Sequence, residues 1–115
     1  MKKSLDKTIF EEANSWIKLN QKVVLATVIQ TWGSSPRQIG SRMIVNENGD
    51  FLGSVSGGCV ESNVINECLE LIKKNYLFKI IDFKVADKNA WDVGLACGGE
   101  ISIYIEQINY EDKNT

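Results

Sequence analysis

The stretch Val23-Val24-Leu25-Ala26-Thr27-Val28-Ile29 decides the fold, because it is apolar on both faces of an extended chain. A strand with one face in water alternates apolar and polar side chains, whereas a strand covered on both faces is almost continuously apolar and rich in β-branched residues. This run therefore predicts a central strand that is covered on both of its faces.

Two amphipathic helices are predicted on either side of this strand in the sequence. The first spans about residues 5–20, where Asn20 can end it, and the second follows Cys59 and ends near Asn75. Each has apolar residues at helical spacing along one face. These apolar residues are Leu5, Ile9, Ala13, Trp16 and Ile17 in the first helix and Val60, Val64, Ile65, Cys68, Leu69 and Ile72 in the second.

The remaining elements are predicted to be strands. Residues 42–45 and 51–53 flank Asn48-Gly49, a pair typical of a tight hairpin turn. Residues 77–86 and 101–106 alternate as extended chains do, and the polar tail 109–115 is expected to fray. The sequence thus predicts one α+β domain over residues 1–115, with a mostly antiparallel or mixed sheet covered by two helices.

Composition narrows the classes of function. The 115 residues suffice for one domain, and the absence of histidine excludes Ser-His-Asp and Cys-His catalysis and every zinc site that contains histidine. Thirteen basic and fifteen acidic residues form no basic patch for nucleic acid, and no apolar run approaches the roughly 20 residues that span a bilayer. We therefore expect a cytoplasmic protein whose three cysteines are reduced thiols.

A glycine-rich turn, Ser56-Gly57-Gly58-Cys59, opens directly into the second predicted helix. Glycines let the backbone approach a ligand, and the first N–H groups of a helix are free donors under a positive dipole. An anion such as phosphate suits this turn. The same dipole favours the thiolate of Cys59, as a nucleophile or as a ligand for a soft metal.

A second turn, Cys97-Gly98-Gly99, has the mirrored order and could face the first. The alternative is that both glycine pairs only form tight turns and that the cysteines are small buried residues. Cys68 lies on the helical apolar face and is expected in the core. The cysteine spacing lacks a Cys-x-x-Cys pair, which disfavours closed structural zinc but leaves open a two-thiolate site for a soft metal.

The loop Trp32-Gly33-Ser34-Ser35-Pro36-Arg37 is another candidate binding segment. Trp32 offers a flat apolar wall, the two serines offer hydroxyls, and Arg37 offers a guanidinium fork that matches phosphate. The alternative is an ordinary turn that contains proline.

Glu61 follows the first glycine–cysteine turn and has two interpretations. We expect it to cap the helix start near the Gly58 backbone, and a general base is the alternative. Glu100, after the second turn, carries the same ambiguity.

Three long motifs together resemble the XdhC/CoxI family of xanthine dehydrogenase accessory factors. The first runs from Ala26-Thr27-Val28 through the Trp32–Arg37 loop to Gly40-Ser41. The second is Gly53-Ser54-Val55-Ser56-Gly57-Gly58-Cys59-Val60-Glu61, and the third is Trp91-Asp92-Val93-Gly94-Leu95-Ala96-Cys97-Gly98-Gly99-Glu100-Ile101. The likeness covers about residues 23–106.

The resemblance implies an accessory factor, a chaperone more than an enzyme, that binds molybdenum cofactor (molybdopterin) and helps to mature xanthine dehydrogenase-type molybdenum hydroxylases. It implicates Cys59 in cofactor binding and suggests Cys97 as a second thiol. The protein would hold no metal of its own, and these two thiols would approach molybdenum only as part of the bound cofactor. The residues expected to contact the cofactor are Trp32, Gly33, Ser34, Ser35, Arg37, Ser56, Gly57, Gly58, Cys59, Glu61, Cys97, Gly98 and Gly99.

The partners implied by the resemblance are the apo-hydroxylase and a cysteine desulfurase. Typical members also continue into a dinucleotide-binding-like domain, whose Gly-x-Gly-x-x-Gly pattern this sequence lacks, so a separate chain could supply it. A homodimer is a further expectation, because a small domain can complete a pocket across a two-fold axis. Two alternatives remain: a thiol enzyme for sulfur or acyl transfer with Cys59 as nucleophile and Cys97 resolving, or a nucleotide- or small-molecule-binding module.

Overall fold

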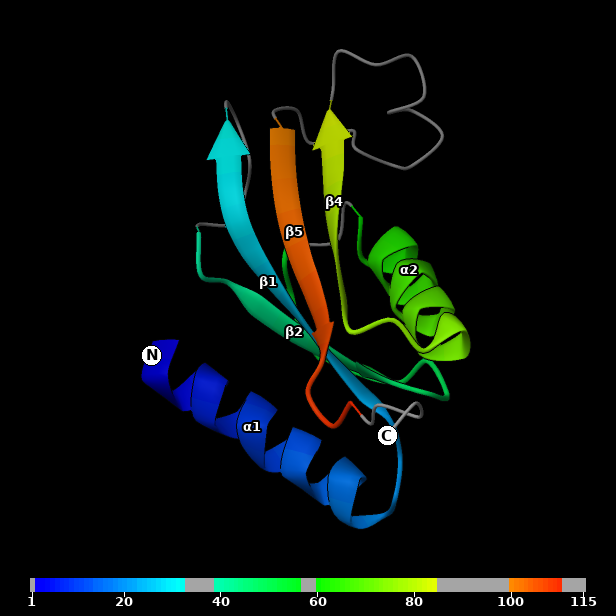
Figure 1. The fold of residues 1–115 in the computed structure, drawn as a ribbon. Coiled ribbons are helices and arrows are strands. Elements are labelled where there is room, and N and C mark those ends of the chain that lie inside the picture. Colours follow the sequence, from blue (N-terminus) through cyan, green and yellow to red (C-terminus); the bar gives the residue numbers. More distant parts are fainter. Residues whose placement is uncertain (1, 33–38, 57–59, 85–99, 111–115) are drawn as a thin grey trace.

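The computed structural model describes residues 2–32, 39–56, 60–84 and 100–110, which form two helices and five strands (Figure 1). In chain order these are α1 (Lys2–Lys18), β1 (Val23–Trp32), β2 (Arg42–Asn46), β3 (Phe51–Gly53), α2 (Glu61–Lys74), β4 (Phe78–Lys84) and β5 (Glu100–Gln107). The predicted α+β fold with one sheet and two helices is confirmed.

The five strands form one antiparallel sheet in the order β3-β2-β1-β5-β4. Strand β1 is central, and it pairs with β2 through Val24 opposite Val45 and with β5 through Ala26 opposite Ile105. The prediction of a central strand from the apolar run is therefore confirmed, but Ile29 at the end of that run is exposed, so the predicted cover on both faces does not extend to it. A β-bulge between Val28 and Gln30 shifts the register with β5.

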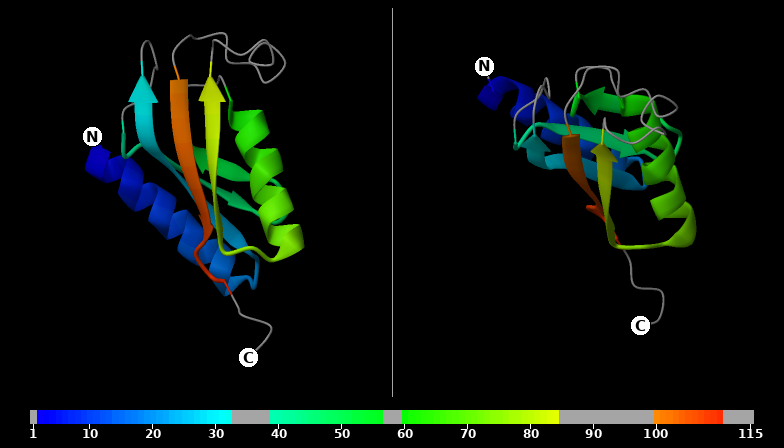
Figure 2. Two further views of the ribbon diagram at one scale, coloured as in Figure 1. Left: turned by 45° about the horizontal axis from the view of Figure 1, so that its top comes forward. Right: turned by 90° about the horizontal axis from the view of Figure 1, so that it is seen from above.

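The two helices cover opposite faces of β1. Val24, Ala26 and Val28 belong to the core cluster that includes Val64, Cys68 and Leu71 of α2. Their neighbours Val23 and Leu25 belong instead to the cluster that includes Ile9, Ala13 and Trp16 of α1. Since successive side chains of a strand point to opposite faces, α1 and α2 lie on the two sides of the sheet, well apart from each other (Figure 2).

The ends of the helices follow their local chemistry. Asn75 adopts the left-handed conformation with φ of 55°, and its backbone N–H bonds to the carbonyls of Leu71 and Ile72, as the sequence predicts for a helix end. Asn20 also has a positive φ of 65° after α1. Helix α1 begins at Lys2, earlier than predicted, and the added turn contains no glycine or proline that would oppose it. Neither helix has both the length and the apolar character to cross a membrane.

Helix α1 covers only part of its face of the sheet. It contacts β1, β2 and β3, whereas the same face of β4 carries Phe78 and Ile80, each about half exposed. The Phe78 ring stacks on Tyr104 of β5 with 5.5 Å between centroids. The β4–β5 half of this face is thus open and partly aromatic.

Asn109, which lies in the tail predicted to fray, is held in place. Its Oδ1 accepts a hydrogen bond from the Val23 N–H at 3.0 Å, and its Nδ2 donates to the Gln21 carbonyl at 2.8 Å. The polar amide satisfies backbone groups at the start of β1, so the ordered chain extends beyond β5. Residues 111–115 lie outside the described part of the chain.

Among the three glycines in the described part of the chain, Gly53 has the least room for a side chain. Its φ is +94°, and an added Cβ would lie 2.5 Å from the Arg42 carbonyl oxygen and 3.0 Å from the Met43 Cα. We expect Gly53→Ala to lower the free energy of unfolding by about 3 kcal/mol or more, measured by urea denaturation.

Gly40→Ala is the matched control for Gly53→Ala. Gly40 has a similar φ of +92° but nothing within 4 Å of an added Cβ, so only backbone strain of about 1 kcal/mol is expected. Equal losses in the two variants would show that the close approach at Gly53 is unimportant.

Candidate functional site

Trp32 of the first motif and Glu100 of the third motif lie at one end of the sheet. Trp32 at the end of β1 and Lys84 at the end of β4 both pair with Glu100, where β5 begins. Helix α2 begins toward this same end (Figures 1 and 2). The antiparallel topology therefore brings together residues 32, 84 and 100, which are far apart in the sequence.

Most of the predicted contact residues lie outside the described part of the chain, so their mutual placement stays a prediction. Of the others, Trp32 is described as the last residue of β1, and Ser56 and Glu61 are described in full. The predicted residues outside the described ranges are Gly33, Ser34, Ser35, Arg37, Gly57, Gly58, Cys59, Cys97, Gly98 and Gly99.

The best-defined polar feature of this region is the Glu61 carboxylate, in the first turn of α2. Its Oε2 accepts hydrogen bonds from the Ser54 hydroxyl at 2.7 Å and from the Val55 and Ser56 N–H groups at 3.0 Å each. Its Oε1 accepts a short hydrogen bond from the Ser56 hydroxyl. Glu61 is only 9% exposed, and Val55 and Ser56 are buried. We call Glu61 with Ser54, Val55 and Ser56 the carboxylate cluster.

Ser56 links the two sides of the segment 57–59. Besides donating to Glu61, its Oγ accepts a hydrogen bond from the Val60 N–H at 2.9 Å. Val60 precedes α2, and its N–H is one of the groups that a helix start leaves without an intrahelical partner. Ser56 thus caps the region of the α2 start, while Glu61 holds Ser56.

The expected cap of Glu61 near the Gly58 backbone lies outside the described residues and stays a prediction. Within the described residues, the Glu61 carboxylate accepts hydrogen bonds from residues 54–56, five to seven positions earlier. Sequence reasoning singled out Ser56 and Glu61 but missed Ser54. The missed signal is the Ser-x-Ser pattern, which offers two hydroxyls to one carboxylate across a short loop.

The electrostatics of the cluster favour the ionised carboxylate. Burial alone would raise the pKa of Glu61, but hydrogen bonds from the Ser56 and Ser54 hydroxyls and from the Ser56 and Val55 N–H groups outweigh it. They lower the pKa from its ordinary value of 4.5 to about 2. A carboxylate with so low a pKa is a poor proton acceptor near neutral pH, which disfavours the general-base alternative for Glu61.

Cys68 is a core residue, as its place on the apolar face of the helix predicts. Its side chain is fully buried among Val64, Leu71 and the isoleucines of β5. Burial, together with the charge of Glu67, raises the pKa of its thiol to about 12. This thiol is therefore inert in the folded protein.

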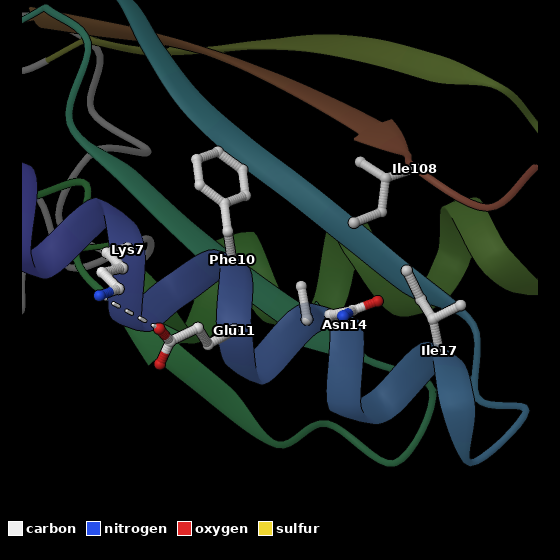
Figure 3. A pocket seen from close by; sticks show the side chains of 7 residues that line it. Lys7, Phe10, Glu11, Asn14, Ile17 and Ile108 are labelled. Carbon is white, nitrogen blue, oxygen red and sulfur yellow. Dashed lines mark ion pairs between the residues drawn. The ribbon is translucent and has the colours of Figure 1, made fainter.

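A separate, shallow groove of about 610 Å³ lies along α1 (Figure 3). Its floor is apolar, and the exposed Lys7–Glu11 ion pair of 3.9 Å lies at its rim. The groove contains none of the predicted contact residues, and among the described residues no group of cysteines and carboxylates is placed to hold a metal ion. The groove is lined by Lys7, Phe10, Glu11, Ala13, Asn14, Ile17 and Ile108.

Comparisons with known proteins agree with the motifs. The family model described as the XdhC and CoxI family matches residues 16–79. Molybdenum cofactor insertion chaperone PaoD of Escherichia coli (strain K12) is 30% identical over 103 residues, which are 89% of this chain and 31% of that protein. A probable xanthine dehydrogenase subunit of Bacillus subtilis (strain 168) is 32% identical over 95 residues, which are 81% of this chain and 28% of that protein.

A solved structure shares the fold. The crystal structure of a xanthine dehydrogenase from Bacillus halodurans superposes with a TM-score of 0.69 at 28% sequence identity. The match covers 86% of this chain and 30% of the other chain. This chain therefore spans about a third of the length of the two relatives and of the solved structure.

The lowered pKa of Glu61 predicts a pH-dependent stability. The ionised carboxylate stabilises the fold above about pH 4.5, and this contribution is lost as the pH falls toward about 2, because the unfolded chain binds the proton first. The difference in free energy of unfolding between the wild type and Glu61→Gln should shrink over this range. Urea denaturation at neutral pH and at about pH 3 measures it.

Glu70→Gln is the control for this pH series, since Glu70 lies on the same helix but is exposed and paired with Lys74 at 3.4 Å. It should change the stability little at either pH. A difference for Glu61→Gln that stayed constant with pH would contradict a role for the carboxylate charge.

Burial of the Cys68 thiol predicts that it reacts slowly with alkylating reagents in the folded protein. A pKa near 12 in place of 9.0 lowers its thiolate fraction about a thousandfold, and burial also blocks access. Iodoacetamide should modify Cys68 only after unfolding in urea, as peptide mass mapping would show. Modification of Cys68 in the native protein at the rate seen in urea would refute its core placement.

Proposed function

This chain belongs to the XdhC and CoxI family, and we propose that it binds molybdenum cofactor as cargo and passes it to a molybdenum hydroxylase of the xanthine dehydrogenase type. The name of the PaoD relative, a molybdenum cofactor insertion chaperone, supports this proposal. The structural observation that carries it is the buried carboxylate cluster at the start of α2, which ties together the residues on either side of Gly57-Gly58-Cys59.

The chemistry of the cargo suits this end of the sheet. Molybdopterin carries a phosphate, which a helix N-terminus such as that of α2 attracts. It also carries a flat pterin and a soft metal bound to sulfur, which suit an aromatic wall and thiols. In the proposal, α2 and Arg37 attract the phosphate, Trp32 lies against the pterin, and Cys59 and Cys97 approach the metal end.

The charge of Glu61 is compatible with an anionic cargo. An exposed carboxylate would repel phosphate, but this one is buried and receives four hydrogen bonds from Ser54, Val55 and Ser56. Hydrogen bonds from oriented dipoles spread and screen the negative charge within the cluster. The start of α2 can therefore keep an attraction for anions.

The remaining steps belong to the same proposal. The apo-hydroxylase is the acceptor, a cysteine desulfurase supplies sulfur for the cofactor, and the cytoplasm keeps the thiols reduced. The relatives are about three times as long as this chain. A dinucleotide-binding-like domain and a second copy of this domain are the further partners in this proposal.

Retention of the cofactor tests the proposal. Anaerobically purified protein is mixed with free molybdenum cofactor and separated by gel filtration, and molybdenum is measured in the protein fraction. The wild type and Cys68→Ala should retain cofactor, because Cys68 is a core residue, whereas Cys59→Ser should retain at least about tenfold less.

Two outcomes would contradict the proposal. The wild type could retain no cofactor, or Cys59→Ser could retain as much as the wild type. Rapid alkylation of Cys59 without cofactor retention would favour the thiol-enzyme alternative instead.

A further inference from the structure

We propose that Glu61 is a positioning residue for cofactor retention, because its carboxylate fixes Ser54–Ser56 and, through Ser56, the Val60 N–H at the start of α2. This inference rests on the proposed function. It concerns a residue that need not touch the cofactor, and it acts through the chain on either side of the segment 57–59.

The two oxygens of the Glu61 carboxylate accept different hydrogen bonds. Oε2 accepts three, from Ser54, Val55 and Ser56, and so fixes the chain that follows β3. Oε1 accepts from the Ser56 hydroxyl and thereby orients it, so that the Ser56 oxygen accepts from Val60 N at 2.9 Å. Glu61 therefore helps to hold Ser56 and Val60 at a fixed separation, which the three residues 57–59 must bridge.

The surroundings make this arrangement rigid. Val55 and Val60 are fully buried in the core under α2, and the Ser54 N–H bonds to the Arg42 carbonyl of β2 at 3.1 Å. The cluster is thus attached to the sheet on one side and to α2 on the other. Groups held by packed elements keep their geometry when a ligand binds or leaves, which suits a protein that must accept a cargo and release it.

A carboxylate suits the donors around this position. Burial of an ionised group carries a desolvation penalty that the hydrogen bonds offset, whereas an apolar side chain would leave the buried Val55 and Ser56 N–H groups without this acceptor. What the carboxylate provides is a small acceptor for four donors at once. A glutamine would turn an NH₂ group toward one or more of these donors, and an aspartate would be one methylene too short to reach them from the same backbone position.

The test combines amide hydrogen exchange with cofactor retention in the full chain. In Glu61→Gln, exchange should accelerate about tenfold or more at Val55, Ser56 and Val60, while amides in the middle of α2 keep their wild-type protection. Cofactor retention should fall about tenfold in the same variant. A role limited to global stability would instead accelerate exchange throughout α2 and the sheet.

Two further variants complete the design. Glu70→Gln makes the same charge change on the exposed side of α2 and should match the wild type in exchange and retention. Ser56→Ala removes one hydrogen bond to Glu61 and the acceptor of the Val60 N–H while the three bonds to Oε2 remain. It should therefore give a folded protein with faster exchange at Val60 and weaker retention, even if Glu61→Gln does not fold.

The outcomes separate this inference from the proposed function. Faster local exchange with unchanged cofactor retention, or unchanged exchange in both Glu61→Gln and Ser56→Ala, overturns the positioning role while the proposed function stands. Failure of the wild type to retain cofactor overturns the proposed function and, with it, the role of Glu61 in retention. Faster local exchange together with weaker retention supports the inference.

Discussion

The double burial of β1 is the constraint on which the rest of the structure depends. Val24, Ala26 and Val28 pack toward α2, and Val23 and Leu25 pack toward α1. Because this part of β1 is covered on both faces, β1 lies inside the sheet, with β2 on one side and β5 on the other. Antiparallel pairing with β5, and of β5 with β4, then places the ends of β1 and β4 beside the start of β5.

The carboxylate cluster applies a second, local constraint at this same region. The hydrophobic core positions α2 and also holds Val55 and Val60 in the chain between β3 and α2. Glu61 adds directional hydrogen bonds to this chain, and its low pKa keeps it ionised under physiological conditions. Core packing thus places the helices and strands, and the carboxylate cluster holds residues 54–56 and the Val60 N–H of the second motif.

Much of the fold could be predicted from residue patterns, and the misses have physical reasons. Continuous apolar β-branched residues identified β1, and Asn-Gly identified the β2–β3 hairpin, because each pattern suits one backbone conformation. On α2, the predicted apolar face omits Leu71, which is buried. Helical spacing alone does not show which of two adjacent faces of a helix packs against the sheet. The Glu61 partners were missed because hydrogen bonds between a loop and a helix depend on tertiary placement. The open β4–β5 half of the sheet face was also not predicted. It depends on tertiary placement as well, because the periodicity of a sequence does not show how far α1 extends across the sheet.

Amide chemical-shift mapping with bound cofactor tests the central claim, that the cargo is held where α2 begins, most directly. A chain of 12.9 kDa is well suited to solution NMR, and the measurement needs only isotope-labelled protein and cofactor under anaerobic conditions. We predict that the largest shifts fall at Ser54, Ser56, Val60 and Glu61, with small shifts along α1. Large shifts confined to the groove residues Phe10, Ile17 and Ile108, with none at the start of α2, would contradict it.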